Sequence, residues 1–213
     1  MGDILTRFFL VRHGETIWNT EKKYQGQSDI PLAEEGRFQA ECLADKLKDE
    51  KLDGVFASDL KRTIETAEII AKPHNLKVVP TKMIRELSFG IWEGLTYEEI
   101  MEKWAQEYQN WIDNPYYTRP PEGESLSELC QRVSKFLMET AKNNPEGRIL
   151  VVSHAGPIRA MLFTLLDLKP SFFWKFKISN TSLTIIEYDG QKELRESDAF
   201  IVTVNNTSHL GII

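Results

Sequence analysis

Two histidines and two arginines stand where predicted strands of this chain end, and their side chains suit phosphate chemistry. Arg12 and His13 directly follow a run of four apolar residues that is typical of a buried strand. Arg62 comes shortly after a second predicted strand, and His154 directly follows the most apolar strand of the chain. Loops at the carboxyl ends of parallel strands converge on one crevice in an open α/β sheet. We therefore expect these four side chains to meet at one sheet edge.

A single histidine at a strand end is more often structural, so the argument depends on this convergence. A metal site is the first alternative, but the chain has no His-x-x-x-His or Cys-x-x-Cys spacing, and two arginines would repel a dication. A phosphate pocket fits better, because guanidinium groups pair with phosphate oxygens through two parallel hydrogen bonds. The neutral imidazole of His13 could then attack a phosphoryl group in line and form a covalent intermediate. The helix that begins near Pro157 would direct its free N–H groups at the same anion.

The departing alkoxide in such a reaction needs a proton, which a carboxyl group could supply. Glu86 follows the third predicted strand and is by topology the carboxyl nearest this edge. The ordinary alternative is a surface carboxylate paired with Arg85. The residues alone favour that alternative.

The elements that must position these residues alternate between strands and helices, which predicts an α/β fold with a mostly parallel central sheet covered by helices. Ser58 and Asp59 are expected to cap the helix that follows them. The last two strands are joined through Asp189-Gly190 and should pair antiparallel at an edge. The predicted strands are Phe8–Val11, Leu52–Ala57, Lys77–Pro80, Arg148–Ser153, Ser182–Tyr188 and Ala199–Val204, and the predicted helices are Ala33–Glu50, Leu60–Lys72, Ser125–Asn143 and Pro157–Leu166.

Residues 91–123 break this alternation and are rich in aromatic side chains. They predict one or two short helices and a loop, inserted as a lid over one edge of the sheet. Aromatic residues at helical spacing more often belong to a core than to a ligand pocket. With no linker or internal repeat, residues 1–213 are expected to form a single domain that includes this lid.

Composition narrows the class of protein and its partners. The chain has 213 residues, with 41% hydrophobic and 27% charged, and no apolar run long enough for a membrane helix. A net charge of −6 argues against a nucleic-acid surface, so an anionic substrate must be attracted by a local basic pocket. Two distant cysteines, Cys42 and Cys130, predict neither a disulfide framework nor a zinc site. With no export signal at the N-terminus, we expect a cytoplasmic protein.

A series of short motifs runs along nearly the whole chain. They are Leu10-Val11-Arg12-His13-Gly14-Glu15-Thr16, Tyr24-Gln25-Gly26 with Asp29 and Pro31-Leu32, Gly36-Arg37-Phe38-Gln39-Ala40, Ser58-Asp59-Leu60 with Arg62-Thr63 and Thr66-Ala67, Glu86 with Phe89-Gly90 and Trp92-Glu93-Gly94, Gly123-Glu124-Ser125, and Val152-Ser153-His154-Ala155-Gly156. In this order the motifs resemble those of the histidine phosphatase superfamily, the phosphoglycerate-mutase-like proteins. The departure from the usual pattern is Ala33, where relatives commonly carry Thr, so the next helix should lack a hydroxyl cap worth about 1 kcal/mol.

The resemblance implies a three-layer sandwich with an antiparallel edge strand and a small helical lid. It implies that His13 is the phosphorylated nucleophile, and that Arg12, Arg62 and His154 complete the phosphate pocket. It assigns Glu86 as the proton donor, which reverses the reading from the residues alone. Asn19 should touch phosphate, and the Gln25-Gly26 turn should approach the substrate through backbone groups. Neither a metal nor another cofactor is implied.

Hydrolases and mutases of this superfamily share the pocket, so the motifs do not distinguish them. The segment after Trp92-Glu93-Gly94 is short for a glycolytic mutase, which favours hydrolysis of a phosphomonoester. The overall pattern is most like bacterial α-ribazole phosphatases and broad-specificity phosphatases. The expected partner is a small phosphorylated metabolite, chosen by residues 91–123, and a homodimer is the assembly considered. A phosphoglycerate mutase and a catalytically idle module that binds a phosphorylated ligand stay as alternatives.

Overall fold

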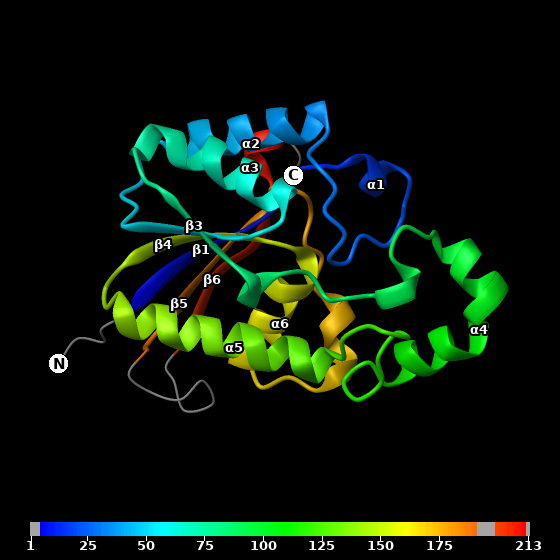
Figure 1. Ribbon diagram of the computed structural model, residues 1–213. Coiled ribbons are helices and arrows are strands. Elements are labelled where there is room, and N and C mark those ends of the chain that lie inside the picture. The colour runs from blue at the N-terminus through cyan, green and yellow to red at the C-terminus, as the bar shows by residue number, and fades with distance from the viewer. Residues whose placement is uncertain (1–4, 191–198, 212–213) are drawn as a thin grey trace.

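A six-stranded sheet forms the centre of the computed structural model, which describes residues 5–190 and 199–211 (Figure 1). The strand order is β3-β2-β4-β1-β5-β6. The first four of these strands pair in parallel, whereas β5 pairs antiparallel with both β1 and β6. This confirms the mostly parallel sheet and its antiparallel edge; the connection 191–198 lies outside the described residues. The strands are β1 Thr6–Arg12, β2 Gly54–Ser58, β3 Val78–Thr81, β4 Arg148–Ser153, β5 Leu183–Tyr188 and β6 Ala199–Asn206.

Helices cover both faces of the sheet, with α2 and α3 on one face and α5 and α6 on the other (Figure 1). Alternate residues of β1 explain these two layers: Phe8 and Leu10 belong to the apolar core beneath α5 and α6, whereas Phe9 and Val11 belong to the core beneath α2 and α3. The three-layer sandwich is therefore confirmed. The helices are α1 Ile17–Thr20, α2 Glu34–Leu47, α3 Lys61–Ala71, α4 Tyr97–Asp113, α5 Leu126–Asn143 and α6 Ala155–Leu165.

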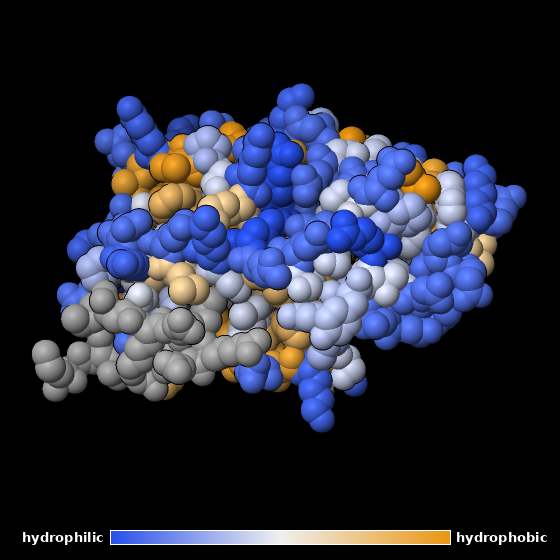
Figure 2. Space-filling view, turned by 60° about the horizontal axis from the view of Figure 1, so that its bottom comes forward, coloured by the Kyte–Doolittle hydropathy of each residue, from blue (hydrophilic) through white to orange (hydrophobic). Residues whose placement is uncertain are grey.

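Short 3-10 turns join several of these elements, and the surface is largely polar. Hydrophilic residues cover most of the face shown in Figure 2, where apolar side chains gather in small separate patches. Among residues 5–190 and 199–211, no helix has the length and apolar character that crossing a bilayer requires. The turns are η1 Lys72–His74, η2 Lys82–Ile84, η3 Gly90–Trp92, η4 Pro170–Lys175 and η5 Ser208–Leu210.

The helix ends correct one prediction and confirm another. Leu60, rather than Ser58 or Asp59, is the N-cap of α3, and it makes no side-chain capping bond. The prediction was wrong because both polar side chains have distant partners: Ser58 bonds to His154 and Asp59 to Arg85. At the start of α2, Ala33 leaves the helix without a side-chain cap, as expected.

The segment 91–123 is helical as the sequence predicts, and a kink divides its main helix, α4, into two shorter pieces. The 17 residues of α4 contain a kink at Trp104, where φ is −135° and ψ is 35°. In Figure 1, α4 extends beyond the end of the sheet that carries α1. The aromatic residues of segment 91–123 serve mainly as a core. Trp92 and Trp111 are 0% and 2% exposed and pack against each other with ring centroids 5.8 Å apart. Backbone hydrogen bonds between Tyr24 and residues 94–95 tie this segment to the loop after α1.

Candidate active site

His13 lies directly after β1, where its backbone N–H still bonds to Ser153 of β4 at 2.9 Å. The side chain is buried, and its Nδ1 is 2.7 Å from the carbonyl oxygen of Gly14. Because a carbonyl can only accept, Nδ1 carries the proton and Nε2 keeps a free electron pair. Gly14 permits this turn, since a Cβ there would stand 2.3 Å from the backbone oxygen of Gly36 in α2.

The surroundings of His13 keep its imidazole neutral. Burial, followed by the nearby charges of Arg62 and Arg12, lowers the pKa of His13 well below 6.5. A buried imidazole between two guanidinium groups thus has its electron pair available at neutral pH. That is the protonation state that nucleophilic attack requires.

His154 follows β4 and packs edge-on against His13, with ring centroids 5.2 Å apart. Its Nε2 is 2.9 Å from Ser58 Oγ, and its Nδ1 accepts from Arg62 Nε at 3.3 Å. Since Arg62 can only donate, the proton of neutral His154 is on Nε2. Burial and the charge of Arg62 lower the pKa of His154 well below 6.5. The ring is fully buried behind His13 and does not line the cavity described below.

Arg62 in the first turn of α3 is 0% exposed and has its guanidinium fixed at three points. Besides the bond to His154, it donates to the carbonyl oxygens of Ser28 at 2.6 Å and Gly26 at 2.7 Å. Arg12, the last residue of β1, donates to the carbonyl oxygen of Ile178 at 2.8 Å. Burial lowers the pKa of each arginine to about 10, so both stay cationic at neutral pH.

The carboxylate of Glu86 is held by backbone N–H groups rather than by Arg85. Its Oε1 accepts from Leu87 at 2.8 Å and from Gly156 at 3.1 Å. Arg85 pairs instead with Asp59 through two bonds of 2.6 and 2.7 Å, so the surface pair considered from the residues alone does not form. The N–H of Gly156, in the first turn of α6, is therefore occupied by Glu86 and is not free for phosphate as the sequence predicted. Glu86 reaches Gly156 because the chain that follows β3 returns to the sheet edge at which α6 begins.

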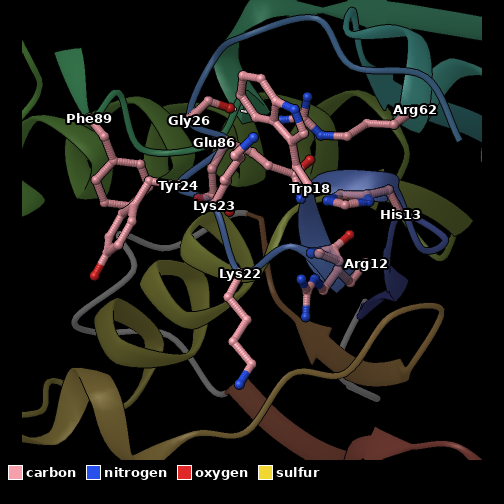
Figure 3. Close-up of a pocket in the computed structure, with 12 residues that line it drawn as sticks. Arg12, His13, Trp18, Lys22, Lys23, Tyr24, Gly26, Arg62, Glu86 and Phe89 are labelled. Atoms are coloured by element: carbon pink, nitrogen blue, oxygen red, sulfur yellow. Dashed lines mark hydrogen bonds between the residues drawn. The ribbon is translucent and has the colours of Figure 1, made fainter. Parts of the chain in front are cut away.

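These residues surround a cavity of about 260 Å³ (Figure 3). Arg12, His13 and Arg62 line its inner part, and Glu86 lines it between these residues and the outer part. The three positions expected to touch substrate, Asn19, Gln25 and Gly26, line it as well.

The contacts of Asn19 leave donor groups free for a substrate, and those of Gly26 explain why a glycine is present. Asn19 Oδ1 accepts from the backbone of Thr16 at 3.0 Å, which leaves its amide N–H groups available. Gly26 has φ of +49°, and a Cβ there would meet the Glu93 carboxylate at 2.1 Å. That close approach explains why glycine is needed in this turn.

The outer part of the cavity contains residues to which the sequence analysis assigned no role at the site. Figure 3 shows Tyr24 and Phe89 on the side opposite His13 and Arg12, with Trp18 and Lys23 between them. Lys22 completes this set of lining residues. One sequence signal could have found most of them: they occupy the polar loop between the nucleophile and α2, which also contains Asn19 and Gly26.

The lid approaches this cavity without lining it. The described lining residues all fall between positions 12 and 89, so 91–123 contributes none of them. The segment does contact one wall, because the hydroxyl groups of Tyr24 and Tyr108 in α4 are 2.7 Å apart. Selection of substrate by 91–123 stays a prediction, and any such effect would have to act through residues such as Tyr24.

Comparisons with known proteins agree with this geometry. Residues 8–197 match the model of the histidine phosphatase superfamily, branch 1. Phosphoserine phosphatase 1 of Hydrogenobacter thermophilus is 38% identical over 207 residues, covering 97% of this chain and 95% of the relative. Probable phosphoglycerate mutase GpmB of Escherichia coli O1:K1 / APEC is 35% identical, with 97% and 95% covered. The α-ribazole phosphatase of Shigella flexneri superposes with a TM-score of 0.83 at 27% identity, with 94% and 96% covered.

The family match spans residues 8–197, a range that includes every described residue lining the cavity around His13 and Arg62. The chain therefore belongs to the histidine phosphatase superfamily, branch 1, and is a phosphatase.

Proposed function

We propose that this phosphatase hydrolyses the phosphomonoester of a small metabolite through a phosphohistidine on His13, without a metal ion. The observation that carries the proposal is the state of His13. Its Nδ1 donates to Gly14, its Nε2 has no hydrogen-bond partner among the described residues, and the ring lines a cavity beside Arg12 and the buried Arg62. This combination supplies a neutral nucleophile and a site for the anion it attacks.

The first half of the reaction transfers the phosphoryl group to the enzyme. A bond forms from His13 Nε2 to phosphorus as the bond from phosphorus to the ester oxygen breaks. The ester oxygen takes a proton from the carboxyl group of Glu86. Arg12, Arg62 and the side-chain amide of Asn19 hold the phosphoryl oxygens, and backbone groups of Gln25 and Gly26 approach the substrate.

The second half releases inorganic phosphate. The Glu86 carboxylate takes a proton from a water molecule, whose oxygen attacks phosphorus and breaks the bond to Nε2. His13 and the protonated Glu86 are then ready for another cycle. Within this scheme His154 completes the phosphate pocket from behind, because it bonds to Arg62 and packs against His13.

Positive charge for this chemistry comes from the two guanidinium groups. Both have their pKa lowered to about 10 by burial and remain charged, so they act in a poorly solvated site where each charge has a large effect. This supports catalysis without a divalent ion. Hydrolysis in the presence of EDTA should therefore equal hydrolysis in its absence.

The test is p-nitrophenyl phosphate hydrolysis in EDTA by the wild-type protein and the His13→Ala variant. We expect the variant to lose at least about 1000-fold in kcat/KM. The His74→Ala variant, which changes a histidine of η1 remote from the cavity lining, is the matched control. Acid quenching would destroy the intermediate, so the phosphoenzyme should be trapped in alkali, where phosphohistidine is stable. Full activity of His13→Ala would overturn the proposal.

The candidate substrates are three phosphate esters taken from the names of the relatives. They are phosphoserine, phosphoglycerate and α-ribazole phosphate. A screen of kcat/KM values across phosphorylated metabolites would rank them. The second candidate function is phosphoglycerate mutase, which the name of one relative favours. It would be recognised by interconversion of phosphoglycerates that depends on a bisphosphorylated primer.

A further inference from the structure

The segment that carries Glu86 lies outside helices and strands, so other contacts must fix its position. Residues 85–89 have no regular secondary structure, and they connect η2 to η3. The backbone N–H groups of Leu87 and Gly156 hold the carboxylate end of the side chain. The carbonyl oxygen of the same residue accepts from the side chain of Gln27 at 3.2 Å and from Arg132 of α5.

Arg132 of α5 makes the main contacts with this backbone. One terminal nitrogen of its guanidinium donates to the carbonyl oxygen of Met83 at 2.9 Å. The other donates to the carbonyl oxygen of Glu86, also at 2.9 Å. One planar group thus bridges two backbone positions three residues apart, and the second of them is Glu86 itself.

Glu124 holds Arg132 and also contacts the segment directly. Its two carboxylate oxygens accept from Nε of Arg132 at 2.6 Å and from a terminal nitrogen at 2.8 Å. Its Oε2 accepts from the N–H of Ser88 at 3.3 Å, and its own N–H donates to the carbonyl oxygen of Ser88 at 2.9 Å. The pair therefore forms hydrogen bonds with the backbone at Glu86 and on both sides of it.

The Arg132–Glu124 pair is well placed to act as a rigid support. The two side chains are only 20% and 15% exposed, and two parallel charge-assisted hydrogen bonds join them. A lysine could not reproduce these contacts, because it lacks the planar set of five donors that reaches a carboxylate and two carbonyl groups together. Small displacements of a catalytic group can cost large factors in rate.

From these contacts we infer that Arg132 and Glu124 are positioning residues for the proton transfer by Glu86. The pair touches no reacting atom; it fixes the backbone from which Glu86 reaches the leaving group. The inference rests on the proposed function, in which Glu86 protonates the departing oxygen. It predicts that weakening the pair impairs proton donation selectively and leaves attack by His13 nearly intact.

The test measures kcat/KM for a series of substituted phenyl phosphates, from p-nitrophenyl phosphate to phenyl phosphate. Ring shape changes little along the series, while the need for a proton on the leaving oxygen increases. kcat/KM reports only steps up to departure of that oxygen, so later hydrolysis of the phosphoenzyme does not enter. We expect Arg132→Lys to lose about 10- to 100-fold on phenyl phosphate and under about threefold on p-nitrophenyl phosphate.

Arg119→Lys is the matched control. Arg119 also pairs with a glutamate of α5, Glu128 at 3.0 Å, but this pair is 58% and 44% exposed and Arg119 bonds to no residue of the Glu86 segment among those described. It should keep the wild-type dependence on the leaving group. Equal losses on both substrates in Arg132→Lys would overturn the inference, because a merely structural support would impair all substrates alike.

A double variant separates the inference from the function on which it rests. In a Glu86→Gln background, Arg132→Lys should add almost no further loss on phenyl phosphate, since the group it positions is already inert. A full additional loss in that background would overturn the positioning role. If His13→Ala were active, the proposed function itself would fail. If Glu86→Gln discriminates between the two substrates and Arg132→Lys does not, only the positioning role fails.

Thermal unfolding checks that each variant is folded at the assay temperature. Should Arg132→Lys not fold, Glu124→Gln carries the same test, because it removes the charge that holds Arg132 while leaving the arginine in place. The same selective loss on phenyl phosphate is then expected. An unchanged leaving-group dependence in folded Glu124→Gln would count against the inference.

Discussion

The inner and outer parts of the cavity are built in different ways. The inner part consists of Arg12, His13 and Arg62 with His154 behind them, and all four lie at or after the ends of strands of one sheet. Their polar atoms bond mostly to backbone groups, and His13 and Arg62 are 3% and 0% exposed. The outer part comes from α1, the loop after it and Phe89, with side chains that are partly open to solvent.

Charge shows the same contrast. Burial lowers the pKa of both inner arginines to about 10, which marks them as poorly solvated cations. The outer Lys23 instead forms an exposed pair with Glu21 at 2.8 Å, and such pairs contribute little to stability. Lys22 has no ion pair among the described residues and adopts a φ of +55°. We therefore expect phosphate binding and chemistry in the inner part, and discrimination among leaving groups in the outer part.

The largest effect should follow a change at the centre of the inner part. Arg62→Lys keeps the positive charge but loses the planar group that reaches His154, Ser28 and Gly26 together. We expect kcat/KM for p-nitrophenyl phosphate to fall by about 100- to 1000-fold. Arg37→Lys, on the exposed side of α2, is the control. A loss below threefold in folded Arg62→Lys would mean that the inner part needs only charge.

The next effect concerns the boundary between the two parts, where the proposed function places Glu86 against the leaving group. Glu86→Gln should lower kcat/KM for phenyl phosphate by about 100-fold and for p-nitrophenyl phosphate by much less, because nitrophenolate departs without a proton. Steady-state rates on both esters check this. Equal losses would assign Glu86 to phosphate binding instead, and would make it an ordinary member of the inner part.

The dependence of the free energy of unfolding on pH should distinguish the inner part, with its two buried histidines, from the outer part. The folded-state pKa values of His13 and His154 lie well below 6.5, so below pH 6.5 the unfolded chain takes up protons that the folded chain excludes. Stability is therefore complete above pH 6.5 and declines as the pH falls toward the folded values. We expect the free energy of unfolding to fall by about 1 kcal/mol for each histidine as the pH is lowered from 6.5 to 5.5.

Urea unfolding at several pH values measures this slope. His209, whose pKa burial lowers to about 4, adds to the same trend, so the comparison is best made in a His209→Asn background. His154→Asn should then flatten the slope. A slope that is unchanged by this substitution would contradict the picture of an inner part that excludes protons.

The smallest effect should come from the contact between the outer part and α4. Tyr108→Phe removes the hydroxyl partner of Tyr24 without removing the ring, and a single hydrogen bond of this kind is worth about 1 kcal/mol. We expect KM for phenyl phosphates to change by about three- to fivefold at constant kcat. Tyr117→Phe, at a residue that is 76% exposed, is the control. A fall in kcat alone would place Tyr24 with the catalytic groups.

Local sequence patterns predicted much of the fold because they report local physics. Alternation in β1 assigns Phe8 and Phe9 to opposite faces, and polar residues directly after apolar runs locate His13 and His154 at strand ends. The kink at Trp104 carries no such signal, since no proline or glycine marks it. The hydrogen bonds of Ser58 and Asp59 to distant partners could not be predicted from local sequence either. Capping propensity is a local preference, and tertiary contacts override it.

The sequence by itself therefore determined the order of the elements, the family, and the residue types that meet at one sheet edge. Tertiary structure alone decided which partner each side chain takes: Glu86 with Gly156, Asp59 with Arg85, and Arg132 with the backbone of Glu86. The physical reason is separation along the chain. Backbone propensity and apolar periodicity act over a few residues, whereas these contacts join positions 26 to 70 residues apart and form only once the layers have packed.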